Sequence, residues 1–197
     1  MSTIKQITRA GYEYQDLIGI RELLQFYKNK NLYDYILLEY PNNGEFSALD
    51  DVVCKIKNQD KYKLIQVKFS VDGEKYLCDW SWLTDKKENG KSLVQKWSKT
   101  LLDMISKDML FEAKIVTNKH PSDENLQIIE NNKISWTNIP DDKKTILINQ
   151  IGSEENCKLF FDNCTLEFLN YDLIGLDEDL FNEYSIFSDV KANWCFF

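Results

Sequence analysis

Apolar and polar positions follow two different periods along the first third of the chain. Between Tyr12 and Lys28 the apolar side chains recur at three- and four-residue steps, a period that predicts an amphipathic helix. The short apolar run Tyr35–Tyr40 predicts a strand. Two more runs, Val52–Ile56 and Tyr62–Phe69, flank the polar residues 57–61, so they predict the two strands of a β-hairpin.

Helical and extended patterns continue to alternate in the rest of the chain. Helical periodicity recurs in five segments: Lys91–Met109, Pro121 to about Asn131, Asp141–Ile151, Glu154–Phe161 and Asp177–Phe187. Short runs typical of extended segments lie at Trp80–Leu83, Phe111–Thr117, Lys133–Trp136 and Thr165–Leu169. This alternation predicts a single α/β domain in which helices flank a mixed central sheet.

The composition is that of a globular protein that does not enter a membrane. The chain has 197 residues, of which 43% are hydrophobic and 28% are charged, enough to bury a proper core. No apolar run approaches the ~20 residues that span a bilayer, and the N-terminus is too polar for a signal peptide. The five cysteines are scattered without a C-x-x-C pair, which is typical of reduced thiols in a cytoplasmic protein.

The net charge of −8 weighs against passive binding of nucleic acid, which usually requires a basic surface. It does not exclude a nuclease, because such a site is locally basic or is bridged to phosphate by a cation. The basic residues that are candidates for contact with a DNA backbone are Lys86, Lys91, Lys96 and Lys99. A solvated helix face explains these lysines about as well.

The predicted hairpin carries the polar residues with the clearest chemical meaning. Gln66 and Lys68 interrupt the apolar second strand and lie two residues apart, so their side chains leave the sheet on the same face. Asp50 and Asp51 open the first strand. Because an unpaired buried charge is costly, Lys68 needs a partner, and an aspartate of the neighbouring strand can supply one. The pair is either a structural ion pair or half of a metal-dependent active site.

A second motif, Asn89-Gly90-Lys91-Ser92, has the sequence of the end of a phosphate-binding loop. The first glycine of such a loop is absent, because Asp85 stands in its place. No apolar strand leads into the segment either. Nucleotide binding at this point is therefore not expected.

The Asp-x14-Gln-x-Lys spacing of Asp51, Gln66 and Lys68 matches the core motif of PD-(D/E)xK nucleases, with Gln66 where the second acid usually stands. Further matching segments are Gly11–Gln15, Leu38-Glu39, Asp50–Val53, Lys91–Leu93 with Lys96-Trp97, and Val116–Asn118. With these segments the chain resembles the N-terminal nuclease domain of bacterial anti-phage effectors. These effectors are the CBASS-associated DNA endonucleases and the nuclease-bearing STAND ATPases. The resemblance implies a restriction-endonuclease-like fold.

The resemblance also implies metal-dependent cleavage of double-stranded DNA, with Asp51, Gln66 and Lys68 at the centre and with Glu39 and Gln15 in support. It implies that Mg²⁺, or Mn²⁺ as a substitute, is held by Asp51, Glu39, the Gln66 side chain and the backbone carbonyl of Val67. The segment between Glu39 and Asp51 is long for the family, so Glu45 is an alternative to Glu39. The neutral Gln66 favours one bound metal over two, unless Glu39 restores the charge.

Two other functions remain open from the residues alone. One is a catalytically inactive module with the nuclease fold that binds nucleic acid or a partner protein, in which Asp51 and Lys68 form a structural pair. The other is a nuclease directed at RNA. Residues 1–197 are expected to form one nuclease domain, either complete or the N-terminal part of a longer effector. The expected assembly is a homo-oligomer or a fused or associated sensing domain.

Overall fold

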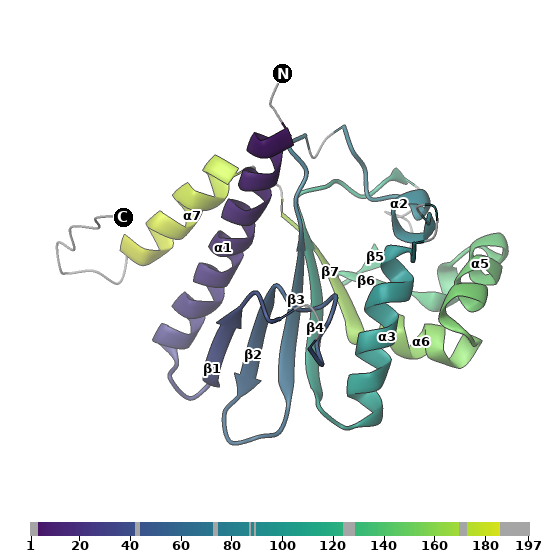
Figure 1. Ribbon diagram of the computed structural model, residues 1–197, viewed down its shortest axis with the longest axis horizontal. Coiled ribbons are helices and arrows are strands. Elements are labelled where there is room, and N and C mark those ends of the chain that lie inside the picture. Colours follow the sequence, from purple (N-terminus) through teal and green to yellow (C-terminus); the bar gives the residue numbers. More distant parts are fainter. Residues whose placement is uncertain are drawn as a thin grey trace.

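A mixed sheet with helices on both faces forms the centre of the computed structural model, which describes residues 4–41, 44–72, 75–86, 88, 90–123, 129–169 and 173–185 (Figure 1). The sheet has the strand order β1-β2-β3-β4-β7. Its strands are β1 (Tyr33–Leu38), β2 (Val52–Ile56), β3 (Tyr62–Lys68), β4 (Leu110–Thr117) and β7 (Cys164–Phe168). The first three strands pair antiparallel, whereas β3 pairs with β4 and β4 with β7 in parallel. The predicted α/β class and mixed central sheet are confirmed, and the arrangement is consistent with a restriction-endonuclease-like fold.

Two layers of helices cover the two faces of this sheet (Figure 1). One layer consists of α1 (Ile4–Lys28) and α7 (Leu173–Ser185). The other consists of α2 (Trp80–Thr84), α3 (Leu93–Ser106), α5 (Asp141–Ile151) and α6 (Glu154–Asn163). A short hairpin of β5 (Ile129–Glu130) and β6 (Lys133–Ile134) lies beside the second layer, followed by the 3₁₀ helix η1 (Trp136–Asn138).

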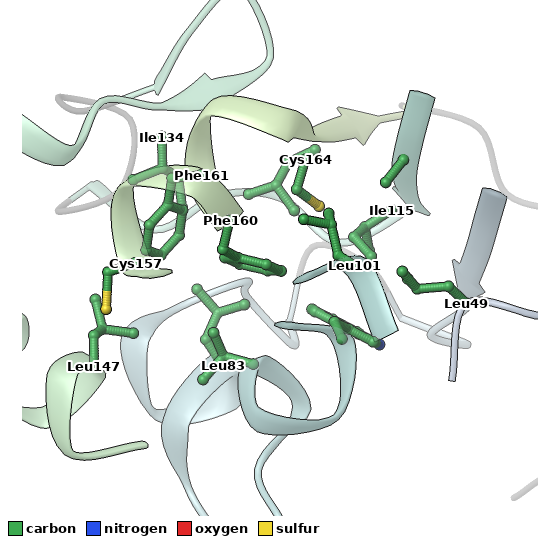
Figure 2. Packing of buried hydrophobic residues seen from close by; sticks show 14 of the residues in the cluster. Leu49, Leu83, Leu101, Ile115, Ile134, Leu147, Cys157, Phe160, Phe161 and Cys164 are labelled. Carbon is green, nitrogen blue, oxygen red and sulfur yellow. The ribbon is translucent and has the colours of Figure 1, made fainter. Parts of the chain in front are cut away.

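Each face of the sheet has its own buried core, because successive strand residues point to opposite sides. Val53, Leu64 and Ile115 belong to the larger cluster, on the side of α3. Their neighbours Val52 and Ile65 belong to the smaller cluster, on the side of α1 and α7. Figure 2 shows part of the larger cluster, in which side chains from α2, α3, α6 and the sheet meet.

Several predicted elements are wrong in type or in extent. Trp80–Leu83 was expected to be extended, but it belongs to the helix α2, whose first turn is capped by the Asp79 carboxylate accepting from the Trp82 N–H at 2.7 Å. The helix predicted from Pro121 to about Asn131 is wrong at its end, where β5 stands, and residues 124–128 lie outside the described residues. The strand predicted at Lys133–Trp136 stops at Ile134.

The remaining differences concern the ends of elements. β1 covers Tyr33–Leu38 rather than Tyr35–Tyr40, and α3 covers Leu93–Ser106 rather than Lys91–Met109. α1 begins eight residues before the predicted start, at Ile4 rather than at Tyr12. α7 begins at Leu173 rather than at Asp177, and the predicted end at Phe187 lies outside the described residues. By contrast, α5 has its predicted bounds, Asp141–Ile151, and is capped by Gly152, whose φ of 112° is a conformation that suits glycine.

Four cysteines of the described residues, Cys54, Cys78, Cys157 and Cys164, are buried free thiols, as the sequence predicts. Cys195 lies outside the described residues. None of the described helices combines the length and the apolar character needed to cross a membrane.

Candidate active site

A groove of about 870 Å³ opens on the α3 side of the sheet, where β2 begins and β3 ends. Asp51, Gln66 and Lys68 all line it, so the structure brings the three central residues of the predicted site together. The other walls are the segment before β2 and the helix α3 with the residues just before it. The residues that line these walls are Gly44, Glu45, Ser47, Ala48, Asp50, Lys91, Leu93, Lys96, Trp97, Lys99, Thr100 and Asp103.

The geometry of the hairpin explains why these side chains converge. Gln66 and Lys68 have the same parity along β3 as Leu64, which packs on the α3 side. The antiparallel register pairs Val52 with Ile65, so Asp51 comes opposite Gln66. The Asp51 carboxylate accepts hydrogen bonds from the Gln66 amide nitrogen and, at 2.6 Å, from the Val67 N–H. A carboxylate is thus fixed at the groove by the end of the neighbouring strand.

Burial makes both aspartates of this site unusual. It raises the pKa of the Asp51 carboxyl above its ordinary value, and the nearby Lys68 ammonium offsets part of the rise. Burial also raises the pKa of Asp50, which is buried and lines the same groove. Sequence reasoning placed Asp50 at the start of the strand but not in the site. The signal that could have found it was its position directly before Asp51.

Lys68 differs from an ordinary structural lysine. Burial lowers the pKa of its ammonium, and repulsion by Lys96 lowers it further. The attraction of Asp51 and Asp50 opposes this shift. Among the described residues, no ion pair joins the Lys68 ammonium to a carboxylate. The interpretation of Asp51 and Lys68 as a direct structural ion pair is therefore not supported. Lys68 instead keeps a charged group beside the groove at some cost in desolvation.

Gln15 and Glu39 occupy a different position from the three central residues. The Gln15 amide donates to the Glu39 carboxylate at 3.4 Å, so the Glu39 side chain reaches towards α1. Glu39 follows β1 with a φ of 52°, and its N–H donates to the carbonyl of Asp51 at 3.0 Å. The backbone of Glu39 therefore adjoins the site, but neither Gln15 nor Glu39 is among the described residues that line the groove. Their supporting role stays a prediction.

Glu45, the alternative to Glu39, does line the groove. Its carboxylate pairs with the Lys107 ammonium at 3.2 Å, and Lys107 also pairs with Asp103 at 2.7 Å. Glu45 is therefore held at the groove by the residue that caps the C-terminal end of α3.

Three of the four candidate DNA-contacting lysines, Lys91, Lys96 and Lys99, line the groove. Lys96 and Lys99 are three residues apart and so share a face of α3. Lys86 is exposed and is not among the residues that line the groove. The basic residues of this segment thus gather beside the half-buried Asp51, although the chain as a whole is acidic.

The Lys91-Ser92 pair of the loop-like motif has a structural explanation. Ser92 is the N-cap of α3: its hydroxyl accepts from the Gln95 N–H at 3.2 Å, and the Gln95 side chain accepts from the Ser92 N–H at 3.2 Å. The Ser92 hydroxyl also donates to the Gln150 side chain at 2.5 Å, which ties the start of α3 to α5. This capping box fixes the helix that carries the groove lysines.

The donor atoms at the groove fit a hydrated hard cation. Among the described residues, no group of three or more His, Cys, Asp or Glu side chains is placed to hold a metal. Mg²⁺ needs only one or two carboxylates because it keeps several waters, and it prefers oxygen ligands. Asp51, the adjacent Asp50 and the amide oxygen of Gln66 are donors of this kind.

The α/β fold, with a groove lined by acidic and basic side chains at the end of a strand hairpin, is consistent with a restriction-endonuclease-like protein. A family model described as "Cap4, dsDNA endonuclease domain" matches residues 6–183. The chain belongs to this family, and it is a double-stranded-DNA endonuclease domain of an anti-phage defence effector. A search of curated proteins found no match to the chain.

Proposed function

We propose that this domain hydrolyses DNA phosphodiester bonds with Mg²⁺ and that Asp51, Gln66 and Lys68 form its catalytic centre. The observation that carries the proposal is the position of Lys68. Its half-buried ammonium has no ion-pair partner among the described residues, and it lines the groove beside the Asp51 carboxylate. A protein gains no stability from such a lysine, whereas a phosphate group in the groove would give it a partner.

Each residue has a defined part in this proposal. Asp51, the side-chain carbonyl of Gln66 and the backbone carbonyl of Val67 would hold Mg²⁺, with Mn²⁺ as a substitute. The bound ion would lower the pKa of a water and stabilise charge on the scissile phosphate. Lys68 orients the attacking water and stabilises the negative charge that develops on the phosphate oxygens. Gln15 and Glu39 support the centre from the α1 side, where they are joined at 3.4 Å.

The groove lysines would hold the DNA backbone. Lys91, Lys96 and Lys99 surround the site on its α3 wall, and each phosphate they neutralise releases counterions and so strengthens binding. Lys86 is proposed to contact the duplex further from the site. Binding is then local, because the net charge of −8 repels DNA from the rest of the surface.

The domain is proposed to act in the cytoplasm, where thiols stay reduced, in keeping with the four free cysteines of the described residues. It is also proposed to act in clusters, either as a homo-oligomer or through a fused or associated sensing domain.

The test is cleavage of plasmid DNA with Mg²⁺ and with EDTA, by the parent, Lys68→Ala and Lys57→Ala. Lys57 is the matched control, because its ammonium lies in the β2–β3 turn and pairs with Asp34 at 3.9 Å. We expect EDTA to stop cleavage and Lys68→Ala to slow it on the order of a thousandfold, while Lys57→Ala cleaves like the parent. A Lys68→Ala protein with parental activity would place the active site elsewhere.

A further inference from the structure

Two buried polar residues at the end of β4 hold the end of β3, although they do not line the groove. Thr117 is 0% exposed and Asn118 is 6% exposed. The Thr117 hydroxyl donates to the carbonyl of Lys68 at 2.5 Å and accepts from the Lys119 N–H at 3.2 Å. Lys68 and Thr117 are also the last paired residues of the parallel β3–β4 ladder. The hydroxyl therefore fixes the backbone of Lys68 where the ladder ends.

Asn118 continues this contact beyond the last pair of strand residues. Its side-chain oxygen accepts from the Ser70 N–H at 2.7 Å, and its side-chain nitrogen donates to the Ser70 carbonyl at 2.6 Å. The amide thus substitutes for one rung of backbone pairing after the two strands have separated. Between the two fixed residues, the ring of Phe69 packs against Tyr14 of α1 at 4.9 Å.

This arrangement is important for Lys68 because it fixes the backbone from which the lysine side chain starts. No ion pair anchors its ammonium among the described residues, so the position of the side chain depends on the backbone from which it starts. We propose that Thr117 and Asn118 are positioning residues for DNA cleavage, which fix the backbone on both sides of Phe69 and thereby aim Lys68 at the groove. This inference rests on the proposed role of Lys68.

A purely structural role of the same bonds is the competing explanation, and the chain offers a matched control for it. Thr165 stands on the neighbouring strand β7 and donates its hydroxyl to the carbonyl of Ala113 in β4 at 3.3 Å. In the parallel β4–β7 ladder Thr165 is the register partner of Lys114, and its side chain lies on the face of the sheet away from the groove. Thr165→Val therefore makes the same chemical change as Thr117→Val without touching Lys68.

The experiment compares Thr117→Val, Thr117→Ser and Thr165→Val. For each, it measures the single-turnover cleavage rate of duplex DNA with Mg²⁺, DNA affinity in EDTA, and the thermal midpoint. Rates are measured well below every midpoint. We expect Thr117→Val to slow cleavage by about tenfold to a hundredfold, because a small misplacement of a catalytic group has an effect of this size. DNA affinity should be unchanged. Thr117→Ser should restore the rate, and Thr165→Val should cleave like the parent.

A second readout does not depend on activity. Reductive methylation with ¹³C-formaldehyde labels the lysines, and the Lys68 signal is the one missing from the spectrum of Lys68→Ala. We expect Thr117→Val, but not Thr165→Val, to move this signal. Parental cleavage by Thr117→Val, or an unmoved Lys68 signal, would overturn the inference.

The comparison of Lys68→Ala with Thr117→Val distinguishes a failure of this inference from a failure of the proposed function. If Lys68→Ala is inactive while Thr117→Val is fully active, the proposed centre stands and only the positioning role is lost. If Lys68→Ala is fully active, the proposed centre is wrong, and the positioning role falls with it.

Discussion

Lys63 and Lys68 stand on the same strand in opposite electrostatic surroundings. They are five residues apart, so their side chains leave β3 on opposite faces. Burial alone would lower the pKa of Lys63, but Glu22, paired at 2.9 Å, and Glu112, at 3.4 Å, raise it above its ordinary value. Lys68 has no such partner among the described residues, and its pKa is lowered. Lys63 stabilises the packing of α1, whereas Lys68 leaves its charge available to a ligand.

The raised pKa of Asp51 makes a prediction about stability as well as activity. The folded protein binds this proton more tightly than the unfolded chain does, so stability falls as the pH rises through the interval between the two pKa values. Asp51→Asn has no such titration and should slow cleavage on the order of a thousandfold while raising the thermal midpoint in EDTA at pH 7. The gain in midpoint should disappear as the pH falls below 3.8, the ordinary pKa of aspartate.

The measurement is a series of thermal melts of the parent and Asp51→Asn in EDTA from pH 3 to pH 8, beside the cleavage assay. The control is Asp60→Asn, at an exposed residue of the β2–β3 turn. A midpoint that falls in Asp51→Asn at pH 7 would show that this carboxylate stabilises the fold, in favour of a structural role.

Gln66 makes a second residue-level prediction, because its amide nitrogen donates to the Asp51 carboxylate. Glu at this position cannot donate, so Gln66→Glu brings two carboxylates together and destabilises the protein in EDTA. A divalent cation should relieve this repulsion, so the midpoint of Gln66→Glu should rise with added Mg²⁺ or Mn²⁺ more than the parental midpoint does. Gln66→Glu should keep its cleavage activity, with a preference shifted towards Mn²⁺, whereas Gln66→Ala should be far less active. Full activity of Gln66→Ala would show that the side chain is not needed.

At the scale of elements, charged side chains join α1 to the sheet. Glu22 is 3% exposed and accepts from both Lys63 and, at 3.1 Å, the Tyr33 hydroxyl. Further along the same face, Arg21 and Lys114 both pair with Glu167 of β7, at 2.7 and 3.0 Å. These contacts fix how α1 lies across β3, β4 and β7.

Glu22→Gln should therefore destabilise the domain by roughly 3–5 kcal/mol, because Lys63 keeps a buried charge without its main partner. The double variant Glu22→Leu/Lys63→Met should recover most of this loss, since no buried charge is left unpaired. Urea denaturation measures both values. Glu13→Gln is the control: it removes an exposed pair with Arg9 and should cost less than about 1 kcal/mol. Equal effects of Glu22→Gln and Glu13→Gln would show that the buried contacts contribute little.

At the scale of the whole molecule, the net charge and the number of catalytic centres limit what one copy can do. The net charge of −8 weakens encounter with DNA at physiological salt. In the proposed mechanism one centre of Asp51, Gln66 and Lys68 would cut one strand, so a double-strand break would need two centres at the same place on the duplex. Tethered copies reach effective concentrations on the order of mM, which offsets weak binding by each copy.

We therefore predict that the free domain mainly nicks DNA and that a dimeric form makes double-strand breaks. The test fuses the domain to a dimeric coiled coil and, as the control, to a coiled coil of the same length whose charges prevent pairing. Linear and nicked plasmid are measured across a dilution series at equal concentration of active centres. Identical ratios of linear to nicked product for the two fusions would contradict the role of clustering.

Local pattern was sufficient for the central pair of strands. The period of two along Tyr62–Phe69 places Gln66 and Lys68 on one face whatever the rest of the chain does, because successive strand residues point to opposite sides. The short polar turn before Tyr62 likewise makes β2 the neighbour of β3, which brings Asp51 to Gln66. The α/β class also follows from local pattern, because helical and extended periods alternate along the chain.

Tertiary structure decided which distant residues complete the groove and which hold it. Trp80–Thr84 forms a helix whose first turn is capped by Asp79. Its five residues are too few to show a helical period in the sequence. Lys96, Lys99 and the segment before β2 meet only because α3 packs across the sheet. Thr117 bonds to the backbone of Lys68, 49 positions away in the chain, because β3 and β4 pair in parallel. Parallel pairing is set by the packing of the crossover between the strands and not by any local period, so only the folded chain determines it.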